Sequence, residues 1–389
     1  MRPGPAWLVF AAACGPAISQ PHDQVAPVQC ATPCQWTRLA IAVDSGVSHG
    51  AAPGAVVAIS LGGVRYLHGT GRLGVDDSTM PGSNTVYDLA SLTKVIGLTT
   101  MVMFAVADGR IDLSAPVGTY VPAFTGPGKD GVTIRHLLTH SSGLPAHRRL
   151  WEQSAGRPEA LALVNATPLD TLPGARTVYS DLGAIVLTEA LESVAGSRID
   201  SILARSLFGP LDMTSTRYLP PASWQSRIAP TEQDPWRGRM LKGEVHDENA
   251  GWLGGVSGHA GLFSTAEDLL VFGEWLLDQW HGPHTAGPGP RLPSAVVREF
   301  TRRQDLVPGA SRALGWDTPS AGSSAGIRLS ARSFGHTGFT GTSIWIDPDR
   351  DLVVVLLSNR VHPTRDNPRL GPLRAVAADR AVAVIEGRP

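Results

Sequence analysis

Apolar positions recur along the chain with two different periods, and the shorter period is found near both ends. Ala55–Leu61 and Val64–Gly69 are β-type runs joined at Gly62-Gly63, a pair that favours a hairpin turn. Thr340–Ile346 and Leu352–Ser358 are runs of the same type close to the C-terminus. The pattern therefore predicts antiparallel strands that come from both ends of the chain.

Elsewhere the apolar positions follow a helical period, and several of these segments stop at Gly or Pro. The predicted helices are Trp36–Val47, Leu92–Asp108, Thr133–His140, Asp181–Ala195, a helix that opens at the capping box Ser264-Thr265-Ala266-Glu267 and runs to Trp280, and Leu373–Glu386. We expect an α+β fold: an antiparallel β-sheet built from both chain ends, flanked by helices, with a large mostly helical lobe at about residues 91–330.

The first residues have the outline of an export signal. An Arg within the first five residues is followed by the apolar run Ala6–Ala13 and then by small residues, which predicts a signal peptide at residues 1–19. Alternatively, Cys14 is the lipidated residue of a lipoprotein-type site. Residues 20–35 are predicted to be a linker and residues 36–388 a single two-lobed domain. We expect an exported protein, periplasmic or extracellular, whose only membrane contact is a lipid anchor at Cys14 if one is present.

Composition and charge narrow the class of partner. Hydrophobic residues make up 42% of the 389 residues, charged residues 17%, and the formal net charge is −1. Such a balance gives no electrostatic basis for binding nucleic acid, so a small-molecule or peptide substrate fits better. Besides Cys14, the cysteines are Cys30 and Cys34. These two residues either form a disulfide in an oxidising compartment or belong to a loose linker. With so few cysteines, we expect neither a zinc site built from cysteines nor a thiol nucleophile.

The candidate nucleophile is Ser91, at the first turn of a predicted helix. Lys94 follows three residues later, which places both side chains on one helix face. A neutral amine can take the hydroxyl proton, and backbone N–H groups at the helix N-terminus can hold an oxyanion. Ser-x-x-Lys is common by chance, but Lys94 leads into the apolar segment Val95–Leu98. Burial there is expected to lower the pKa of Lys94 and suit it to proton transfer.

A second candidate element is Tyr179-Ser180-Asp181, directly before a predicted helix. The Tyr179 phenol can share the general-base work if it lies near Ser91 and if Lys94 lowers its pKa. The structural alternative is that Tyr179 is a buried aromatic residue and that Asp181 caps the helix.

A third candidate element is His336-Thr337-Gly338, just before the predicted strand Thr340–Ile346. Gly338 leaves room for a substrate backbone to lie along the strand, with Thr337 beside it. The backbone N–H of Phe339 is expected to complete an oxyanion hole with that of Ser91.

These three elements, in this order, resemble the motifs of the serine β-lactamase and penicillin-binding protein superfamily, and in particular its class C β-lactamase-like branch. The resemblance covers roughly residues 36–388. It rests on Tyr87-Asp88-Leu89-Ala90-Ser91-Leu92-Thr93-Lys94, on Leu137-Leu138-Thr139-His140-Ser141-Ser142-Gly143-Leu144-Pro145, and on His336-Thr337-Gly338. It implies a nucleophile at Ser91 that forms an acyl-enzyme, Lys94 as its partner, Tyr179 as the second base and substrate contacts at Thr337 and Gly338. The candidate substrate-binding residues are Asp181, His336, Thr337, Gly338 and Phe339. No cofactor is implied.

The chain departs from the family pattern at two positions. His336 stands where the third motif often has Lys, and Asp181 stands where the second motif often ends in Asn. His is close to neutral at pH 7, so it provides no permanent charge for a substrate carboxylate. Both departures weaken the case for an efficient β-lactamase. They favour a D,D-peptidase, a D-aminopeptidase or an esterase, acting on an ester or amide such as a D-amino-acid peptide of the cell wall.

A narrower likeness links residues 243–264 to a subgroup of secreted or lipid-anchored members of the superfamily. We expect His246, Asp247 and Asn249 to line the substrate cleft. His246, Asp247 and Glu248 together with His259 also suggest a metal site, but they lack the helical spacing of a catalytic zinc motif, so no metal is predicted.

One rival function remains, a catalytically silent penicillin- or peptidoglycan-binding protein. Such a protein is expected to lack Ser91, Lys94 or Tyr179, and all three are present. The sequence therefore favours the enzyme.

Overall fold

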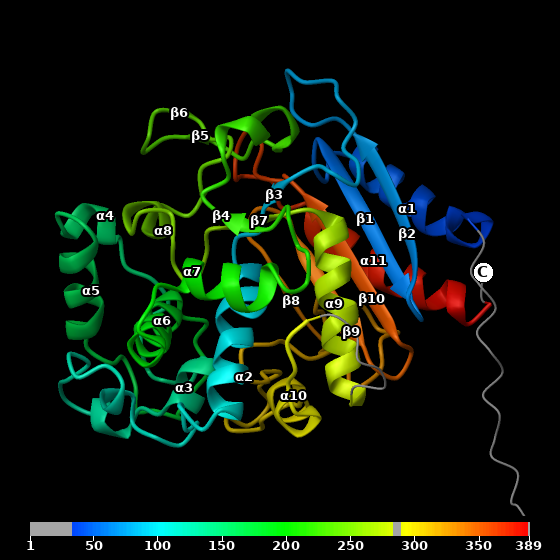
Figure 1. Cartoon of the computed structure of the whole chain (residues 1–389). Helices are drawn as coiled ribbons and strands as arrows, with labels where there is room; N and C mark the ends of the chain where they lie inside the picture. Colours follow the sequence, from blue (N-terminus) through cyan, green and yellow to red (C-terminus); the bar gives the residue numbers. More distant parts are fainter. Residues whose placement is uncertain (1–32, 283–288, 388–389) are drawn as a thin grey trace, which may run out of the picture. The chain divides into compact units, whose positions relative to one another are not determined.

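The computed structural model describes residues 33–282 and 289–387 (Figure 1). The chain divides into two units, Met1–Cys30 and Ala31–Pro389. The predicted signal peptide, Cys14 and Cys30 lie outside the described residues. Among the residues that are described, no helix is long and apolar enough to cross a membrane.

A five-stranded antiparallel sheet forms the centre of the larger unit, in the order β2-β1-β10-β9-β8 (Figure 1). Two of its strands come from the N-terminal part of the chain and three from the C-terminal part, which confirms the predicted origin of the sheet. Both hairpin glycines between β1 and β2 have positive φ, as a tight turn requires. The strands are β1 (Gly54–Leu61), β2 (Val64–Gly71), β8 (Phe334–Thr337), β9 (Ser343–Asp347) and β10 (Leu352–Ser358).

The central strands are buried on both faces, which explains why they read as unbroken apolar runs rather than as alternating ones. Every residue of β1 and β10 is buried. Successive side chains belong to different cores: Val56 and Val353 pack in the larger core, whereas Val57 and Val354 pack in the smaller one.

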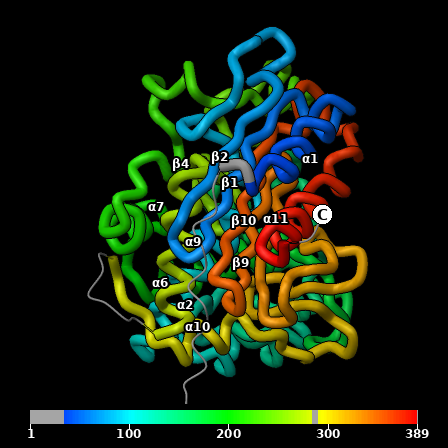
Figure 2. The backbone as a smooth tube through the Cα atoms, turned by 90° about the vertical axis from the view of Figure 1, so that its right-hand side faces the viewer, coloured from blue at the N-terminus to red at the C-terminus, as the bar shows by residue number. Residues whose placement is uncertain are grey.

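Helices cover the two faces of the sheet. On one face α1 (Thr37–Ser48) and α11 (Leu370–Ile385) pack against each other and against the sheet, and Figure 2 shows them side by side. On the other face α9 (Ala266–His281) contacts β1 and β10. It begins one residue later than the predicted capping box implies: the N-cap is Thr265 rather than Ser264, and the Thr265 side chain accepts a hydrogen bond from the backbone N–H of Asp268.

The helical lobe lies between the two groups of strands in the sequence. Its core is continuous with the α9 face of the sheet and includes buried residues such as Leu98, Leu182 and Leu262. The helices of the lobe are α2 (Thr100–Ala107), α3 (Ile134–Leu138), α4 (Leu150–Gln153), α5 (Arg157–Ala166), α6 (Asp181–Ala195), α7 (Ile199–Leu203), α8 (Glu248–Trp252) and α10 (Ser294–Thr301). Short 3₁₀ helices are η1 (Pro33–Trp36), η3 (Val117–Thr119), η4 (Lys129–Gly131) and η6 (Ala222–Arg227). Two π-helical segments are η2 (Lys94–Thr99) and η5 (Ala204–Phe208).

The described residues also form two small sheets. One has the order β3-β7-β4 and joins β3 (Tyr87–Asp88), β4 (Arg217–Tyr218) and β7 (Leu262–Ser264). The other is a hairpin of β5 (Gln233–Asp234) and β6 (Arg239–Met240). Strands of two or three residues carry no periodic signal, so none of them was expected from the sequence.

Several predicted elements differ from the observed ones. The predicted helix Leu92–Asp108 begins with a π-helical segment, η2, before the α-helix proper. Thr340–Thr342 belong to a turn, and the strand begins only at Ser343. Asp181 does not cap α6, because the Ser180 hydroxyl accepts the capping hydrogen bond from Gly183.

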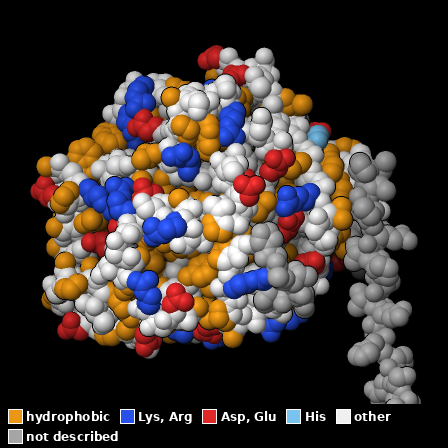
Figure 3. Space-filling model, in the orientation of Figure 1, with side chains coloured by type: hydrophobic (Ala, Val, Ile, Leu, Met, Phe, Trp, Pro, Cys, Tyr) orange, Lys and Arg blue, Asp and Glu red, His pale blue; other side chains and the backbone are white. Residues whose placement is uncertain are grey.

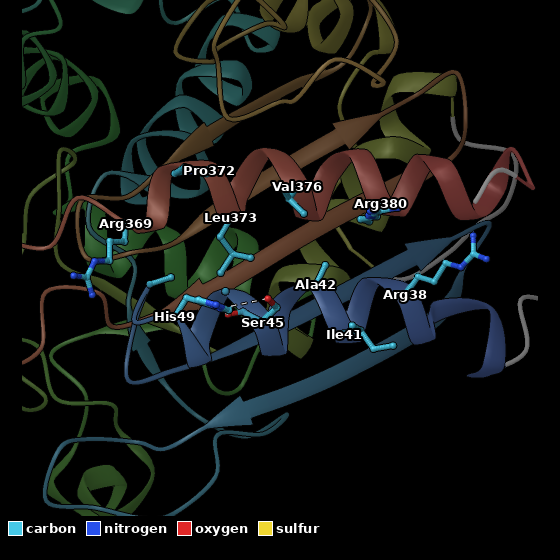
Figure 4. Close-up of a pocket in the computed structure, with 12 residues that line it drawn as sticks. Arg38, Ile41, Ala42, Ser45, His49, Arg369, Pro372, Leu373, Val376 and Arg380 are labelled. Atoms are coloured by element: carbon cyan, nitrogen blue, oxygen red, sulfur yellow. Dashed lines mark hydrogen bonds between the residues drawn. The ribbon is translucent and has the colours of Figure 1, made fainter.

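Surface charge is mixed on the face shown in Figure 3, where blue and red side chains are interspersed. A hollow of about 910 Å³ lies between α1 and α11, with Arg38 and Arg380 at one end and Arg369 at the other (Figure 4). It shares no lining residue with the smaller cleft that contains Ser91. Although this hollow is the larger of the two, the candidate nucleophile does not lie in it, so its volume is no evidence that the reaction takes place there.

Candidate active site

Ser91 follows the short strand β3 at a strained turn. Ala90 has φ +47°, a conformation that costs a non-glycine residue free energy and occurs often at functional sites. The Asp88 carboxylate holds this turn, because its Oδ1 accepts a hydrogen bond of 2.8 Å from the Ala90 backbone N–H. The helical segment that begins at Leu92 then carries Lys94 back toward Ser91.

Lys94 is buried, with 3% of its surface exposed, and three groups surround its ammonium. Its Nζ donates hydrogen bonds to Ser91 Oγ at 3.1 Å and to the His259 carbonyl oxygen at 3.0 Å. It also forms an ion pair with Asp181 Oδ1 at 2.6 Å. Two hydrogen bonds and one ion pair match the three N–H groups of an ammonium. The resting Lys94 is therefore protonated.

The expectation that burial lowers the pKa of Lys94 is wrong. Burial has the largest single effect and does act downward, but the charge of Asp181 and the interaction with Tyr179 together raise the pKa of Lys94 above its ordinary value. Asp181 is thus a counter-ion of Lys94 rather than a free substrate contact.

Tyr179 packs against the same ammonium, with Lys94 Nζ 4.9 Å from its ring centroid. Its phenolic oxygen is buried and has no hydrogen bond of good geometry to any described residue, although both Lys94 and Ser91 are near enough to affect its pKa. Burial raises the pKa of Tyr179, and the Lys94 charge offsets this only in part. Tyr179 is a neutral phenol at rest, not a phenolate.

His336 lies on the edge strand β8, buried and with its ring centroid 5.8 Å from that of Tyr179. Burial, reinforced by the charges of Arg312 and Lys94, holds the pKa of His336 well below the usual histidine value. Its Nδ1 is 2.8 Å from the Thr337 carbonyl oxygen, so Nδ1 carries the proton and Nε2 is left as a buried acceptor. The ring therefore offers no positive charge.

The turn after β8 is tied to the chain just before Ser91. Thr340 Oγ1 donates to the Asp88 carbonyl oxygen at 2.7 Å, and Thr342 Oγ1 donates to that of Leu89 at 2.9 Å. Gly338 is required in this contact, because a Cβ there would lie 2.4 Å from the Leu89 carbonyl oxygen.

This attachment positions two backbone donors. Neither the Ser91 N–H nor the Phe339 N–H has an acceptor within residues 33–282 and 289–387. Ser91 and Phe339 line the same cleft. The pair is available to hold an oxyanion there.

The cleft has a volume of about 450 Å³. It brings together Ser91, Tyr179, Asp181 and Phe339 with His246 and Asp247 from the predicted cleft segment. Its other lining residues are Ala90, His147, Arg149, Trp151, Glu248, Ala260 and Arg365.

A family model described as beta-lactamase matches residues 39–379. The chain belongs to the beta-lactamase family.

Individual relatives agree with this assignment. A protein of Salmonella typhi, provisionally named a D-alanyl-D-alanine carboxypeptidase, is 32% identical over 322 residues, which cover 75% of this chain and 73% of the relative. Among solved structures, a penicillin-binding protein homologue from Caulobacter crescentus has a TM-score of 0.72 at 20% identity and covers 90% of this chain and 98% of its own. EstCE1, a hydrolase with promiscuous acyltransferase activity, has a TM-score of 0.70 at 21% identity, and the match covers 88% of this chain and 98% of EstCE1. The two solved structures show the shared fold, and this beta-lactamase family member is a serine hydrolase.

Sequence reasoning missed the role of Asp88 in this family member. Its second carboxylate oxygen accepts the His246 backbone N–H at 2.7 Å, so one buried carboxyl holds both the Ser91 turn and the cleft segment. Burial raises the pKa of Asp88. A buried acidic residue within the Ser91 motif was the available signal, but its second partner lies 158 residues away along the chain.

A second residue that the sequence did not single out is Arg374 of α11. Its guanidinium donates to the carbonyl oxygens of Gly338 at 2.6 Å and Thr342 at 3.1 Å, which braces the same turn from behind. Burial lowers the pKa of Arg374 to about 10.

Asn249 does not line the cleft, contrary to the expectation. It is wholly buried, accepts the Leu150 N–H and donates to the Arg148 carbonyl oxygen, so it holds the loop before α4.

The residues considered as metal ligands form separate pairs. The His246 ring contacts Glu232 at 2.8 Å, and the His259 ring contacts Asp247 at 2.8 Å. In the part of the chain that the structure describes, no group of three such side chains converges.

Proposed function

We propose that this protein is an exported serine peptidase or esterase that forms an acyl-enzyme on Ser91, with D-alanyl peptides as its main substrate class. The observation that carries the proposal is the 3.1 Å hydrogen bond between buried Lys94 and Ser91, in a cleft where two backbone N–H donors have no acceptor among the described residues. The provisional name of the Salmonella typhi relative supports the choice of D-alanyl peptides.

The reaction begins with a proton transfer inside the ion pair. Because Lys94 is an ammonium at rest, it must lose a proton before it can accept one from Ser91. Asp181 is in contact at 2.6 Å, and one proton moved across that contact converts two charges into two neutral groups. A substrate that displaces water from the cleft favours this neutral form.

Neutral Lys94 then takes the Ser91 proton as Ser91 Oγ attacks the substrate carbonyl carbon. The N–H groups of Ser91 and Phe339 stabilise the oxyanion of the tetrahedral intermediate. Tyr179, a phenol with Lys94 beside it, passes a proton to the departing amine or alcohol and regains one from Lys94. Water attacks the acyl-enzyme by the same route in reverse, which releases the acid and restores Ser91.

Two features favour peptides and esters over β-lactams as substrates. His336 is neutral, so it cannot attract a substrate carboxylate as a lysine would. Asp181 is occupied by Lys94 and has no amide N–H to offer a substrate carbonyl group. We expect β-lactams to acylate Ser91 slowly and to turn over poorly.

Export is part of the proposal and rests on the sequence alone. The charged start, the apolar run Ala6–Ala13 and the small residues up to Ser19 support a signal peptide, and Cys14 supports the lipoprotein alternative. A periplasmic or extracellular location would give the enzyme access to cell-wall peptides.

A substrate panel tests the proposed activity. Purified protein and a Ser91→Ala variant are assayed on D-alanyl-D-alanine peptides, p-nitrophenyl esters and nitrocefin. We expect turnover of the peptides and esters that exceeds nitrocefin turnover, and none by the variant. Hydrolysis of nitrocefin alone would contradict the substrate class, and equal turnover by Ser91→Ala would contradict the nucleophile.

A further inference from the structure

The hollow between α1 and α11 has the size and lining of a binding site separate from the cleft that contains Ser91. Its volume is about 910 Å³. Figure 4 shows Leu373 and Val376 pointing from α11 toward α1, and Ala42 pointing from α1 toward α11. The middle of the hollow is therefore apolar. Ligand sites in proteins commonly have this volume and a mostly apolar lining with a few polar groups.

The charges around the hollow are positive. Arg38 and Arg380 lie at one end, and Arg369 lies at the other (Figure 4). Among the described residues, no Asp or Glu lines the hollow, and none of the three guanidiniums forms an ion pair or a hydrogen bond with another described side chain or backbone group. Cations gathered without a counter-ion favour an anionic ligand.

The acidic residues of the two helices have other partners. On α1 the acidic residue is Asp44, which pairs with His68 at 2.7 Å. On α11 it is Asp379, whose carboxylate accepts the backbone N–H groups of Ile327 and Arg328 at 2.8 and 2.9 Å. Neither helix therefore supplies a counter-ion to the three arginines.

The length of the hollow suits one hydrocarbon chain. Arg369 and Arg380 are separated by about 16 Å along α11, at a rise of roughly 1.5 Å per residue. Two layers of acyl chains make the roughly 30 Å hydrocarbon core of a bilayer, so one chain reaches about 15 Å. A chain in the hollow would also cover Ile41, which leaves 60% of its surface exposed. Removing such apolar surface from water favours binding.

A peptide fits the hollow less well than a hydrocarbon chain. The two walls are α-helices, whose backbone N–H and C=O groups are hydrogen-bonded within each helix. Between the arginines, the polar side chains are Ser45 and His49, and His49 Nδ1 is already 2.7 Å from the Ser45 carbonyl oxygen. An extended peptide would lose water from its own backbone groups and find few partners in return.

A second copy of the chain is disfavoured as well. A twofold dimer places the same surface of both copies against each other. The interface would then gather Arg38, Arg369 and Arg380 from each copy, and like charges brought together oppose association.

We propose that the hollow between α1 and α11 binds the anion of a long-chain fatty acid. Its carboxylate lies at the end that holds Arg38 and Arg380, and its chain lies along Leu373 and Val376. Guanidinium groups are suited to this role because they donate paired hydrogen bonds to a carboxylate. The inference goes beyond the proposed function and does not depend on it, because the hollow and the Ser91 cleft share no lining residue.

Isothermal titration calorimetry of the whole chain with dodecanoate tests the site. We expect one dodecanoate bound per chain. Dodecyltrimethylammonium, which reverses the charge, and hexanoate, which shortens the chain, should each bind at least tenfold more weakly. The double variant Arg38→Gln/Arg380→Gln should bind dodecanoate about tenfold more weakly than wild type. Ala42→Trp, which places a large ring in the hollow, should abolish binding in a protein whose circular dichroism is unchanged.

Two variants are the controls. Arg110→Gln removes an exposed arginine outside the hollow, and Ser91→Ala alters the other cleft, so both should bind dodecanoate as wild type does. Undiminished binding by Arg38→Gln/Arg380→Gln would overturn the site. So would wild-type protein that does not bind dodecanoate, including protein in which a second copy fills the hollow. Binding to phosphatidylglycerol vesicles or to a hexaglutamate peptide, but not to free dodecanoate, would overturn the choice of ligand.

Discussion

At the scale of single residues, the central feature is that Lys94 is buried and charged at once. Burial alone would favour a neutral amine, but an ammonium in contact with Asp181 at 2.6 Å is held in its charged form. The apolar pattern around Lys94 predicted its burial correctly. It could not predict the counter-ion, because Asp181 lies far away in the sequence and approaches only when α6 packs on the helical segment of Lys94.

Removing the counter-ion should therefore change the pH dependence of the reaction. In Asp181→Asn, burial is no longer offset by a negative charge, so the pKa of Lys94 falls. In the wild type the Lys94 proton passes to Asp181 within the protein, so kcat/KM does not require its loss to solvent. In Asp181→Asn the amide cannot take that proton, so Lys94 must lose it to solvent, and kcat/KM is expected to show a rising limb with pH that the wild type lacks. The profile is measured on a p-nitrophenyl ester with wild type as the reference. A variant profile without that limb would contradict the role of Asp181 as the acceptor of the Lys94 proton.

At the scale of elements, the site depends on how the turn after β8 meets the turn after β3. Two threonine hydroxyls hold these turns together, the Arg374 guanidinium braces the turn after β8, and Gly338 allows the close approach. The strands β1 and β10 were predictable because they are long, apolar runs. The strands β3 and β8 were not, because their pairing is decided by tertiary contacts rather than by periodicity. The proximity of Tyr179 to Ser91 likewise follows from the resemblance of the motifs, not from their spacing.

The contact between the turns yields a prediction for Gly338→Ala. A methyl group there would meet the Leu89 carbonyl oxygen at 2.4 Å and push the Phe339 N–H away from that of Ser91. Loss of one oxyanion donor lowers kcat by roughly 10²–10³-fold. We expect a folded protein, judged by its circular dichroism, with that loss of kcat on an ester. Gly82→Ala is the control, since a Cβ there has no neighbour within 4 Å. Full activity in Gly338→Ala would contradict the assigned oxyanion hole.

At the scale of the whole molecule, a buried ionic network joins the C-terminal loop to the cleft segment. Glu232 accepts hydrogen bonds from the His246 ring and from Arg365, and Arg365 also pairs with Glu248. Burial acts to raise the pKa of Glu232, but these hydrogen bonds lower it to about 2. None of these pairings was predicted, because each joins residues that the sequence pattern leaves unrelated.

This network makes stability depend on pH in a defined window. The pKa of Glu232 in the folded protein is lower than its ordinary value of 4.5. The ionised Glu232 side chain therefore contributes fully to the free energy of unfolding above pH 4.5, and this contribution disappears as the pH falls to about 2. Glu232→Gln is expected to be less stable than wild type by about 2 kcal/mol at pH 7, because solvent at the partly exposed Arg365 screens part of the roughly 3 kcal/mol that the full pKa difference represents. Urea unfolding at several pH values measures the difference, which should shrink between pH 4.5 and pH 2.

The control for that experiment is Glu152→Gln, which removes an exposed ion pair with Arg149 and should change stability little. A difference for Glu232→Gln that is the same at pH 7 and at pH 2 would show that the Glu232 charge does not contribute.

The most direct test of the whole account is the mass of the protein after reaction with a fluorophosphonate. Displacement of fluoride by the Ser91 oxygen would leave a phosphonyl group on that residue alone. We predict a single adduct, mapped by proteolysis to the peptide that contains Ser91, and no adduct in a folded Ser91→Ala variant. An unlabelled wild-type protein, or an adduct that persists in Ser91→Ala, would contradict the assignment of Ser91 as the nucleophile.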